Sequence, residues 1–91
     1  MASYALLVRH ALAPGTGDPA EFTLDDCATQ RNLNEEGREQ SARIGRLLHQ
    51  AGLQEIEFFS SQWCRCRETA EISRDALIAA CLLYTSDAAD E

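Results

Sequence analysis

The sequence predicts an α/β domain in which strands alternate with helices and the strands form a parallel sheet. The short apolar run at residues 4–8 and the segment at residues 55–59 read as strands, and a predicted helix follows each of them. This alternation favours crossover connections, which make neighbouring strands parallel. We therefore expect part of a parallel-sheet sandwich, built in the order strand, helix, strand, helix.

The first strand is expected at residues 4–8, where the apolar run is nearly continuous. Such a run suits a strand that is buried on both faces of a parallel sheet. Arg9 and His10 follow directly and should lie at its carboxyl end. Residues 11–30 are rich in proline, glycine and aspartate, which predicts a long loop with turn chemistry.

The first helix is expected to begin after Asn34, which is a good N-cap residue. Ile44 and Leu47 recur at helical spacing, and Gly52 supplies a stop. Gly37 would cost about 1 kcal/mol relative to alanine inside a helix. Its presence indicates either close packing or tolerance near the helix end.

The second strand, residues 55–59, leads through a serine turn into a helix expected at residues 63–80. Arg65 lies at the start of that helix. Carboxyl ends of parallel strands share one edge of a sheet, and ligands of α/β proteins gather beyond that edge. Arg65 and the Arg9–His10 pair are therefore expected to open at the same edge.

The last eleven residues, 81–91, can be encoded by a string that resembles a transposase-type sequencing adapter. A segment of that origin would not have been selected to fold. We therefore expect residues 1–80 to be the N-terminal part of a single domain, and residues 81–91 to be a non-native tail.

Length and charge limit the class of protein. Ninety-one residues allow one small domain with a thin core. The formal net charge of -7 argues against binding to nucleic acid or to a membrane surface. The run at residues 4–8 is too short for a signal peptide or a membrane span, so the expected compartment is the cytoplasm, with an export signal upstream of Met1 left open.

The four cysteines, at positions 27, 64, 66 and 81, match neither zinc-site spacing nor a Cys-x-x-Cys redox motif. A small disulfide scaffold is disfavoured as well. We expect unpaired thiols in a reducing compartment, and no metal site.

The combination of His10 with Arg9 and Arg65 predicts a phosphate site. Arginine binds phosphate oxygens through a planar fork of donors and keeps its charge. A neutral imidazole can attack phosphorus when its other nitrogen is held protonated by a hydrogen bond. Neighbouring positive charges favour that neutral form of the His10 ring.

Three ordered segments resemble the histidine phosphatase superfamily, which includes the phosphoglycerate mutase-like enzymes: L-L-V-R-H-A at 6–11, N-L-N-E-E-G-R-E-Q-S at 32–41 and F-F-S-S-Q-W-C-R-C-R-E-T-A at 58–70. The resemblance implies that His10 is the nucleophile, that Arg9 belongs to the Arg-His-Gly signature and that Arg65 is the second phosphate-pocket arginine. It also implies the phosphoglycerate mutase-like type of sandwich. Ala11 departs from the signature because it replaces the usual glycine, and it is tolerated only if the backbone there does not need a positive φ.

The resemblance implies a phosphatase that acts on phosphate monoesters or protein phosphohistidine through a phosphohistidine intermediate, without a cofactor. Phosphorylated small molecules or phosphoproteins are the expected partners. A phosphomutase of the same superfamily remains an alternative, as does a phosphate-binding or interaction fragment without turnover.

Complete family members also carry a second histidine and usually a carboxylate proton donor in their C-terminal half. The only other histidine of this chain is His49, expected near the end of the first helix. The chain is therefore expected to be truncated and inactive by itself. Arg31 could line the mouth of the pocket as a substrate-binding residue, although an ordinary surface arginine is the preferred interpretation.

Overall fold

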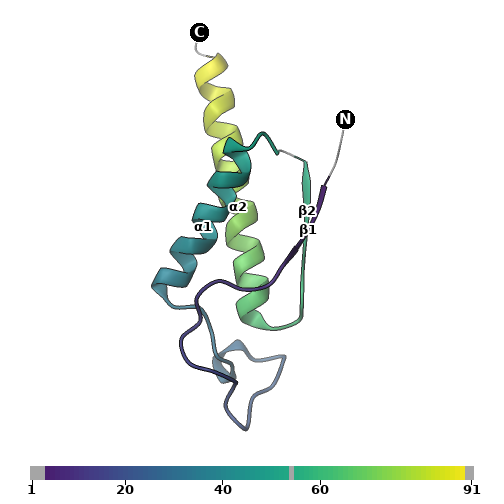
Figure 1. Ribbon diagram of the computed structural model, residues 1–91, viewed down its shortest axis with the longest axis vertical. Helices are drawn as coiled ribbons and strands as arrows, with labels where there is room; N and C mark the ends of the chain where they lie inside the picture. The colour runs from purple at the N-terminus through teal and green to yellow at the C-terminus, as the bar shows by residue number, and fades with distance from the viewer. Residues whose placement is uncertain (1–3, 54, 90–91) are drawn as a thin grey trace.

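The computed structural model describes residues 4–53 and 55–89, with side chains described up to Leu82. The element order is β1 (Tyr4–Val8), a 3-10 turn η1 (Cys27–Thr29), α1 (Glu35–Gln50), β2 (Ile56–Ser60) and α2 (Cys64–Ala89), as Figure 1 shows. The predicted alternation of strands and helices is confirmed.

The two strands form a parallel sheet, as expected. Their register runs from the pair Tyr4 and Ile56 to the pair Val8 and Ser60, and the Tyr4 N–H donates to the Glu55 carbonyl at 3.0 Å. β2 lies one residue later than predicted. The parallel pairing brings the carboxyl ends of both strands to the same edge of the sheet.

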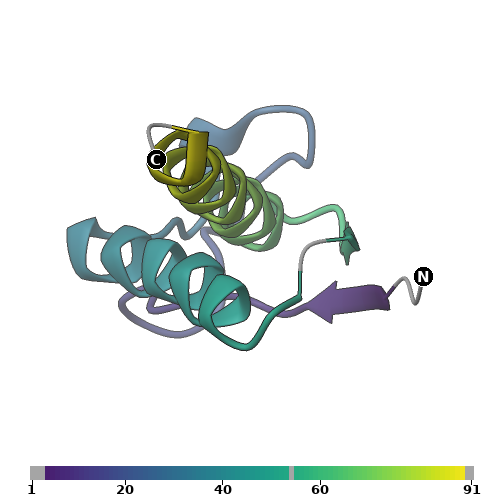
Figure 2. The same ribbon diagram turned by 90° about the horizontal axis from the view of Figure 1, so that it is seen from above.

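The sheet is covered on one face. Both helices lie on the same side of the strands in Figures 1 and 2, and α2 packs against the strands and against α1. Leu6 and Phe58 are half-buried, whereas Leu7 is 81% exposed and Phe59 is 49% exposed. The expectation that β1 is buried on both faces is wrong, because no other element of the described residues covers the outer face.

The two helices approach each other closely where small residues meet. A Cβ on Gly45 would collide with the backbone carbonyl of Ser73, and the Ser73 hydroxyl donates to the Ser41 carbonyl at 2.8 Å. A Cβ on Gly37 would likewise collide with the Leu12 carbonyl. Close packing therefore explains why glycine occupies position 37 despite its low helix propensity.

Both ends of α1 agree with the capping residues predicted from the sequence, whereas the end of α2 does not agree with its prediction. The Asn34 side chain accepts the Gly37 N–H at 2.8 Å, which confirms the predicted N-cap. Gly52 has a φ of +82°, the left-handed conformation that ends helices. α2 continues to Ala89, nine residues beyond its predicted end at residue 80, and the proposed boundary of the natural domain there stays a prediction.

The long loop predicted at residues 11–30 lies beyond the carboxyl ends of the strands, below both helices in Figure 1. It contains the short η1 turn, whose N-cap Asp26 accepts the Ala28 N–H at 3.1 Å. An isolated bridge joins Thr23 to Asp26. The loop is thus folded back on itself, next to the start of α2.

Candidate functional site

The segments that carry His10 and Arg65 are joined by hydrogen bonds through Thr69. The Ala11 N–H donates to Thr69 Oγ1 at 3.1 Å, and the Thr69 hydroxyl donates to the Arg65 carbonyl at 2.7 Å. Thr69 is almost completely buried. This link holds the end of β1 against the first turns of α2.

The His10 ring is half-buried, and its Nδ1 lies 2.7 Å from the Ala11 carbonyl oxygen. A carbonyl can only accept, so Nδ1 carries the hydrogen in this contact. In the neutral ring Nε2 then keeps its lone pair, which is the arrangement that a nucleophilic histidine requires. Ala11 is not strained, because positive φ angles occur among the described residues only at glycines.

His10 borders an open cavity of about 350 Å³. The other lining residues come from the neighbouring loop and from α1: Ala11, Gln40, Arg43, Ile44 and Leu47. Gln40 supports the wall, since its side-chain oxygen accepts the Leu12 N–H at 2.9 Å. The lining contains a cation and an amide but no carboxylic acid, and Arg65 does not border this cavity.

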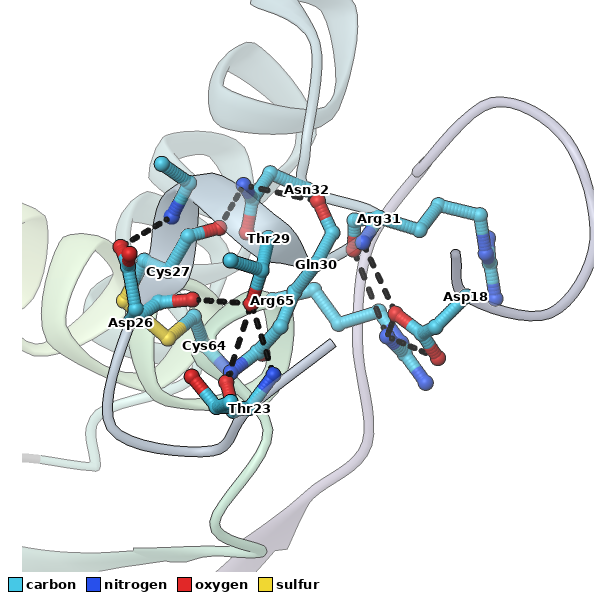
Figure 3. Close-up of a disulfide and its surroundings, with 11 residues drawn as sticks. Asp18, Thr23, Asp26, Cys27, Thr29, Gln30, Arg31, Asn32, Cys64 and Arg65 are labelled. Carbon is cyan, nitrogen blue, oxygen red and sulfur yellow. Dashed lines mark hydrogen bonds and ion pairs between the residues drawn. A yellow bond between two sulfur atoms is a disulfide. The ribbon is translucent and has the colours of Figure 1, made fainter. Parts of the chain in front are cut away.

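Arg65 is held by an ion pair with Asp18, shown in Figure 3. Its Nη1 lies 2.9 Å and 3.2 Å from the two carboxylate oxygens and 3.3 Å from the Arg31 carbonyl. The exposed fractions of the side chains are only 10% for Arg65 and 8% for Asp18. Nε of Arg65 is buried without a hydrogen-bond partner.

Asp18 also accepts the backbone N–H of Arg31 at 2.8 Å. This hydrogen bond holds the pKa of the Asp18 carboxyl below its usual value, and Arg65 lowers that pKa further, while desolvation by burial acts in the opposite direction. Asp18 is therefore a carboxylate at neutral pH. It connects the residues 11–30 loop to α2.

Trp63 packs over the guanidinium of Arg65, with 4.6 Å between Cζ and the ring centroid. Its ring also meets that of Phe22 at a centroid distance of 5.0 Å. Trp63 therefore packs between the long loop and the Arg65 side chain. Trp63 thus fixes one face of the Arg65 side chain.

The other two arginines named from the sequence have different surroundings. Arg31 is half-buried, and its guanidinium donates to the loop carbonyls of Gly17, at 2.8 Å, and Ala13. Arg31 thus clamps the loop, which the preferred surface interpretation had not foreseen. The Arg9 residue is exposed, and its guanidinium forms no hydrogen bond or ion pair with another residue in the described part of the chain.

A disulfide joins Cys27 to Cys64, so the expectation of unpaired thiols is wrong for these two residues. Cys66 and Cys81 are not part of this disulfide. The reason is tertiary: η1 folds back onto the start of α2, and the Cys64 N–H donates to Gln30 Oε1 at 2.9 Å (Figure 3). The bond fixes the loop to the residue that precedes Arg65.

Sequence reasoning treated Asp18 only as turn chemistry and missed its partner Arg65. The two residues are 47 positions apart, and no periodic pattern connects them. The cysteine pair carried a weak signal, since Cys64 directly precedes Arg65 and Cys27 lies in the loop expected at the same sheet edge. Spacing alone could not identify that pair.

Two further properties bear on the class of site. Among the described residues, no group of three or more histidine, cysteine, aspartate or glutamate side chains is arranged to hold a metal ion. Nor does the described part of the chain contain a helix long and apolar enough to cross a membrane.

Comparison with known protein families matches residues 5–85 to the histidine phosphatase superfamily (branch 1). The match covers most of the chain and spans β1, α1, β2 and most of α2. The chain therefore belongs to the histidine phosphatase superfamily, whose members are mostly enzymes. No curated protein and no solved structure shows significant similarity to it.

Proposed function

We propose that the chain carries the phosphate-accepting half of a histidine phosphatase site, with His10 as nucleophile and Arg9 and Arg65 as phosphate-binding partners. The single observation that carries this proposal is the Nδ1 contact of His10 with the Ala11 carbonyl, at 2.7 Å. That contact leaves Nε2 available for attack. Membership of the superfamily supports the same assignment.

In the proposed reaction, His10 Nε2 attacks the phosphorus of a phosphate monoester. The N–P bond forms, the ester P–O bond breaks, and the leaving oxygen takes up a proton. Water then attacks the phosphohistidine, which returns the free imidazole and releases inorganic phosphate. Protein phosphohistidine would be an alternative donor, with a nitrogen in place of the ester oxygen.

The arginines would stabilise negative charge on the transferring phosphoryl group. Arg65 is suited to this role because its guanidinium is already held on one face by Trp63 and at Nη1 by Asp18. Arg9 adjoins the nucleophile in the sequence and is exposed, so its guanidinium is available to a ligand.

A second proposal is that the 91-residue chain binds or accepts phosphate without repeated turnover. The cavity that His10 borders contains no carboxylic acid that could protonate a leaving group. His49 lies in the last turn of α1, two positions after the lining residue Leu47, and is not itself part of the lining. The lining of this cavity therefore contains neither a second histidine nor a carboxylic acid.

We also propose that the chain functions in an oxidising compartment. Disulfides persist in oxidising environments and are rare in the cytoplasm. The Cys27–Cys64 bond therefore favours an oxidising compartment over the cytoplasm expected from the sequence. Counting free thiols in protein isolated under acid quench would test this proposal.

The decisive experiment for His10 is covalent trapping. The chain is incubated with ³²P-labelled phosphoramidate and quenched in base, and the labelled residue is identified by peptide mapping. We expect acid-labile, base-stable label on His10, at no more than one phosphate per chain. His10→Asn should abolish the label.

His49→Asn is the matched control, because it removes the other histidine and should keep the label. Label that persists in His10→Asn would overturn the assignment. Continuous release of phosphate by the 91-residue chain, in excess of its own concentration, would overturn the second proposal.

A further inference from the structure

We propose that Asp18 is a positioning residue, which anchors Nη1 of Arg65 so that the Nε and Nη2 edge of the guanidinium is presented to a phosphate group. This inference rests on the proposed function, since it concerns the arginine that would bind the phosphoryl group. It gives Asp18 a role that the sequence does not suggest.

The hydrogen bonds of Arg65 leave one edge of its guanidinium for a ligand. Nη1 is occupied by both oxygens of Asp18 and by the Arg31 carbonyl. Nη1 lies on the Cδ side of the group, so Nε and Nη2 form the opposite fork, which is the one suited to bidentate contact with phosphate. Among the described residues, no acceptor hydrogen-bonds to Nε.

The unpartnered Nε points to a missing acceptor. A buried donor without a partner is costly because its bond to water has been lost and not replaced. A phosphate oxygen would supply the missing bond without first stripping water from Nε. Side chains around Nε must move apart to admit the ligand. Because Trp63 packs on the same guanidinium, its fluorescence should change when the ligand binds.

In the opposite role, Asp18 would compete with phosphate for Arg65. A carboxylate on Arg65 could itself occupy the place of a phosphate, so that a ligand would have to displace it. The two roles predict opposite signs when Asp18 is removed. A competitor that is removed leaves Arg65 free and tightens anion binding, whereas loss of an anchor weakens it even though one negative charge has disappeared.

The experiment is a titration of the 91-residue chain with sulfate at constant ionic strength, followed by calorimetry and by fluorescence of Trp63, which is the only tryptophan. Sulfate is the probe because it has the tetrahedral shape and dianionic charge of phosphate. The variants are Asp18→Ala, Asp18→Asn and Arg65→Lys. Asp25→Ala is the matched control, since Asp25 is an exposed aspartate of the same loop.

We expect Asp18→Ala to weaken sulfate binding about tenfold or more, since it releases a charged hydrogen-bond anchor. Asp18→Asn should weaken it less, because the amide oxygen can still accept one bond. Arg65→Lys should weaken it at least as much as Asp18→Ala, and Asp25→Ala should bind sulfate as the unmodified chain does. Without sulfate, both Asp18 variants should change the Trp63 emission, because Arg65 moves off the ring.

Unchanged or tighter binding by Asp18→Ala, with binding still lost in Arg65→Lys, would overturn the inference alone. Should Asp18→Ala prove unfolded by circular dichroism, Asp18→Asn decides: sulfate affinity and Trp63 emission equal to those of the unmodified chain would overturn it. A different pattern, in which the unmodified chain does not bind sulfate or Arg65→Lys binds it equally well, would overturn the proposed function itself.

Discussion

Asp18 and Arg65 form a buried ion pair with a shortest N–O distance of 2.9 Å, although 47 positions separate them in the sequence. The pair joins the loop that follows His10 to the start of α2. Around it lie the Cys27–Cys64 disulfide and the stacked ring of Trp63. The stability of this chain and the phosphate binding proposed for Arg65 are therefore expected to depend on the same few contacts.

Acid should destabilise the chain through Asp18. Its pKa is lowered in the folded state, chiefly by the Arg31 N–H and further by Arg65, the two basic residues that face it. Its contribution to stability is thus complete above the ordinary aspartate pKa and is lost as the pH falls through the lowered, folded-state pKa. We expect the urea midpoint to fall with acid less steeply in Asp18→Asn than in the unmodified chain.

Asp25→Asn is the control for this acid profile, since it removes an exposed carboxylate from the same loop. Its urea midpoints should run parallel to those of the unmodified chain from neutral pH into acid. Equal acid sensitivity in Asp18→Asn and the unmodified chain would contradict the role given to the ion pair.

Reduction of the disulfide should destabilise the chain. Cys27 and Cys64 are 37 residues apart, and closing a loop of that length stabilises a protein by about 4 kcal/mol in the chain-entropy model. We expect the double variant Cys27→Ser, Cys64→Ser to lose about that free energy of unfolding. Dithiothreitol should lower the urea midpoint of the unmodified chain and leave that of the double variant unchanged.

Thiol counting checks the same pairing directly. Alkylation of the denatured, unreduced chain should modify only Cys66 and Cys81, the two cysteines outside that disulfide. After reduction, all four cysteines should react. Modification of four thiols before reduction would show that the disulfide is absent.

Gly45→Ala should loosen the contact between the helices. The added Cβ would meet the Ser73 carbonyl and would lie 2.7 Å from the Ala76 Cβ. Because a backbone carbonyl cannot swing away, we expect a cost toward the upper end of about 1–3 kcal/mol. That cost exceeds the gain of about 1 kcal/mol from replacing a helical glycine by alanine. Chemical denaturation measures the net loss.

Arg46→Ala is the neighbouring control on α1. Arg46 is exposed, and its ion pair with Glu39, at 3.3 Å, is exposed as well. Such pairs contribute less than about 1 kcal/mol, so the unfolding free energy should change little. If Gly45→Ala were as stable as Arg46→Ala, the close helix crossing would be contradicted.

Two leucines should respond very differently to truncation. Leu77 is 3% exposed in the core, and Leu77→Ala should cost about 2–5 kcal/mol of unfolding free energy. Leu7 is 81% exposed on the outer face of β1, and Leu7→Ala should change that free energy by less than about 0.5 kcal/mol. A large loss in Leu7→Ala would mean that the outer face of the sheet is covered in solution.

Much of the fold could be predicted because its signals are local. The Asn34 cap, the Gly52 stop and the patterns of the two strand segments each depend on residues that are close in the sequence. The end of α2 was misjudged, because residues 81–91 were set aside as a tail while the helix continues to Ala89. Burial of β1 was misjudged for a different reason: an apolar run indicates what a strand can bury, not which elements are there to cover it.

For the candidate site, too, the features that depend on neighbouring residues could be predicted, and those that depend on tertiary contacts could not. Arg9, His10 and Arg65 were identified from residue types and their order, and their chemical roles stay predictions. The sequence also predicted that the two segments carrying these residues lie at the same sheet edge. The parallel pairing of β1 and β2 confirms that prediction. The partners of these residues, Asp18 above all, depend on how the long loop folds back, and no short-range pattern encodes that path.

By itself, the sequence determined the order of the elements and the parallel pairing, and it named Arg9, His10 and Arg65 as candidates for binding and accepting phosphate. Only the tertiary structure decided that Cys27 bonds to Cys64, that Asp18 anchors Arg65 and that one face of the sheet stays open. The physical reason is range. Helix caps and apolar periodicity act over a few residues, whereas a disulfide, a buried ion pair and the covering of a sheet require segments that are distant in the chain to meet.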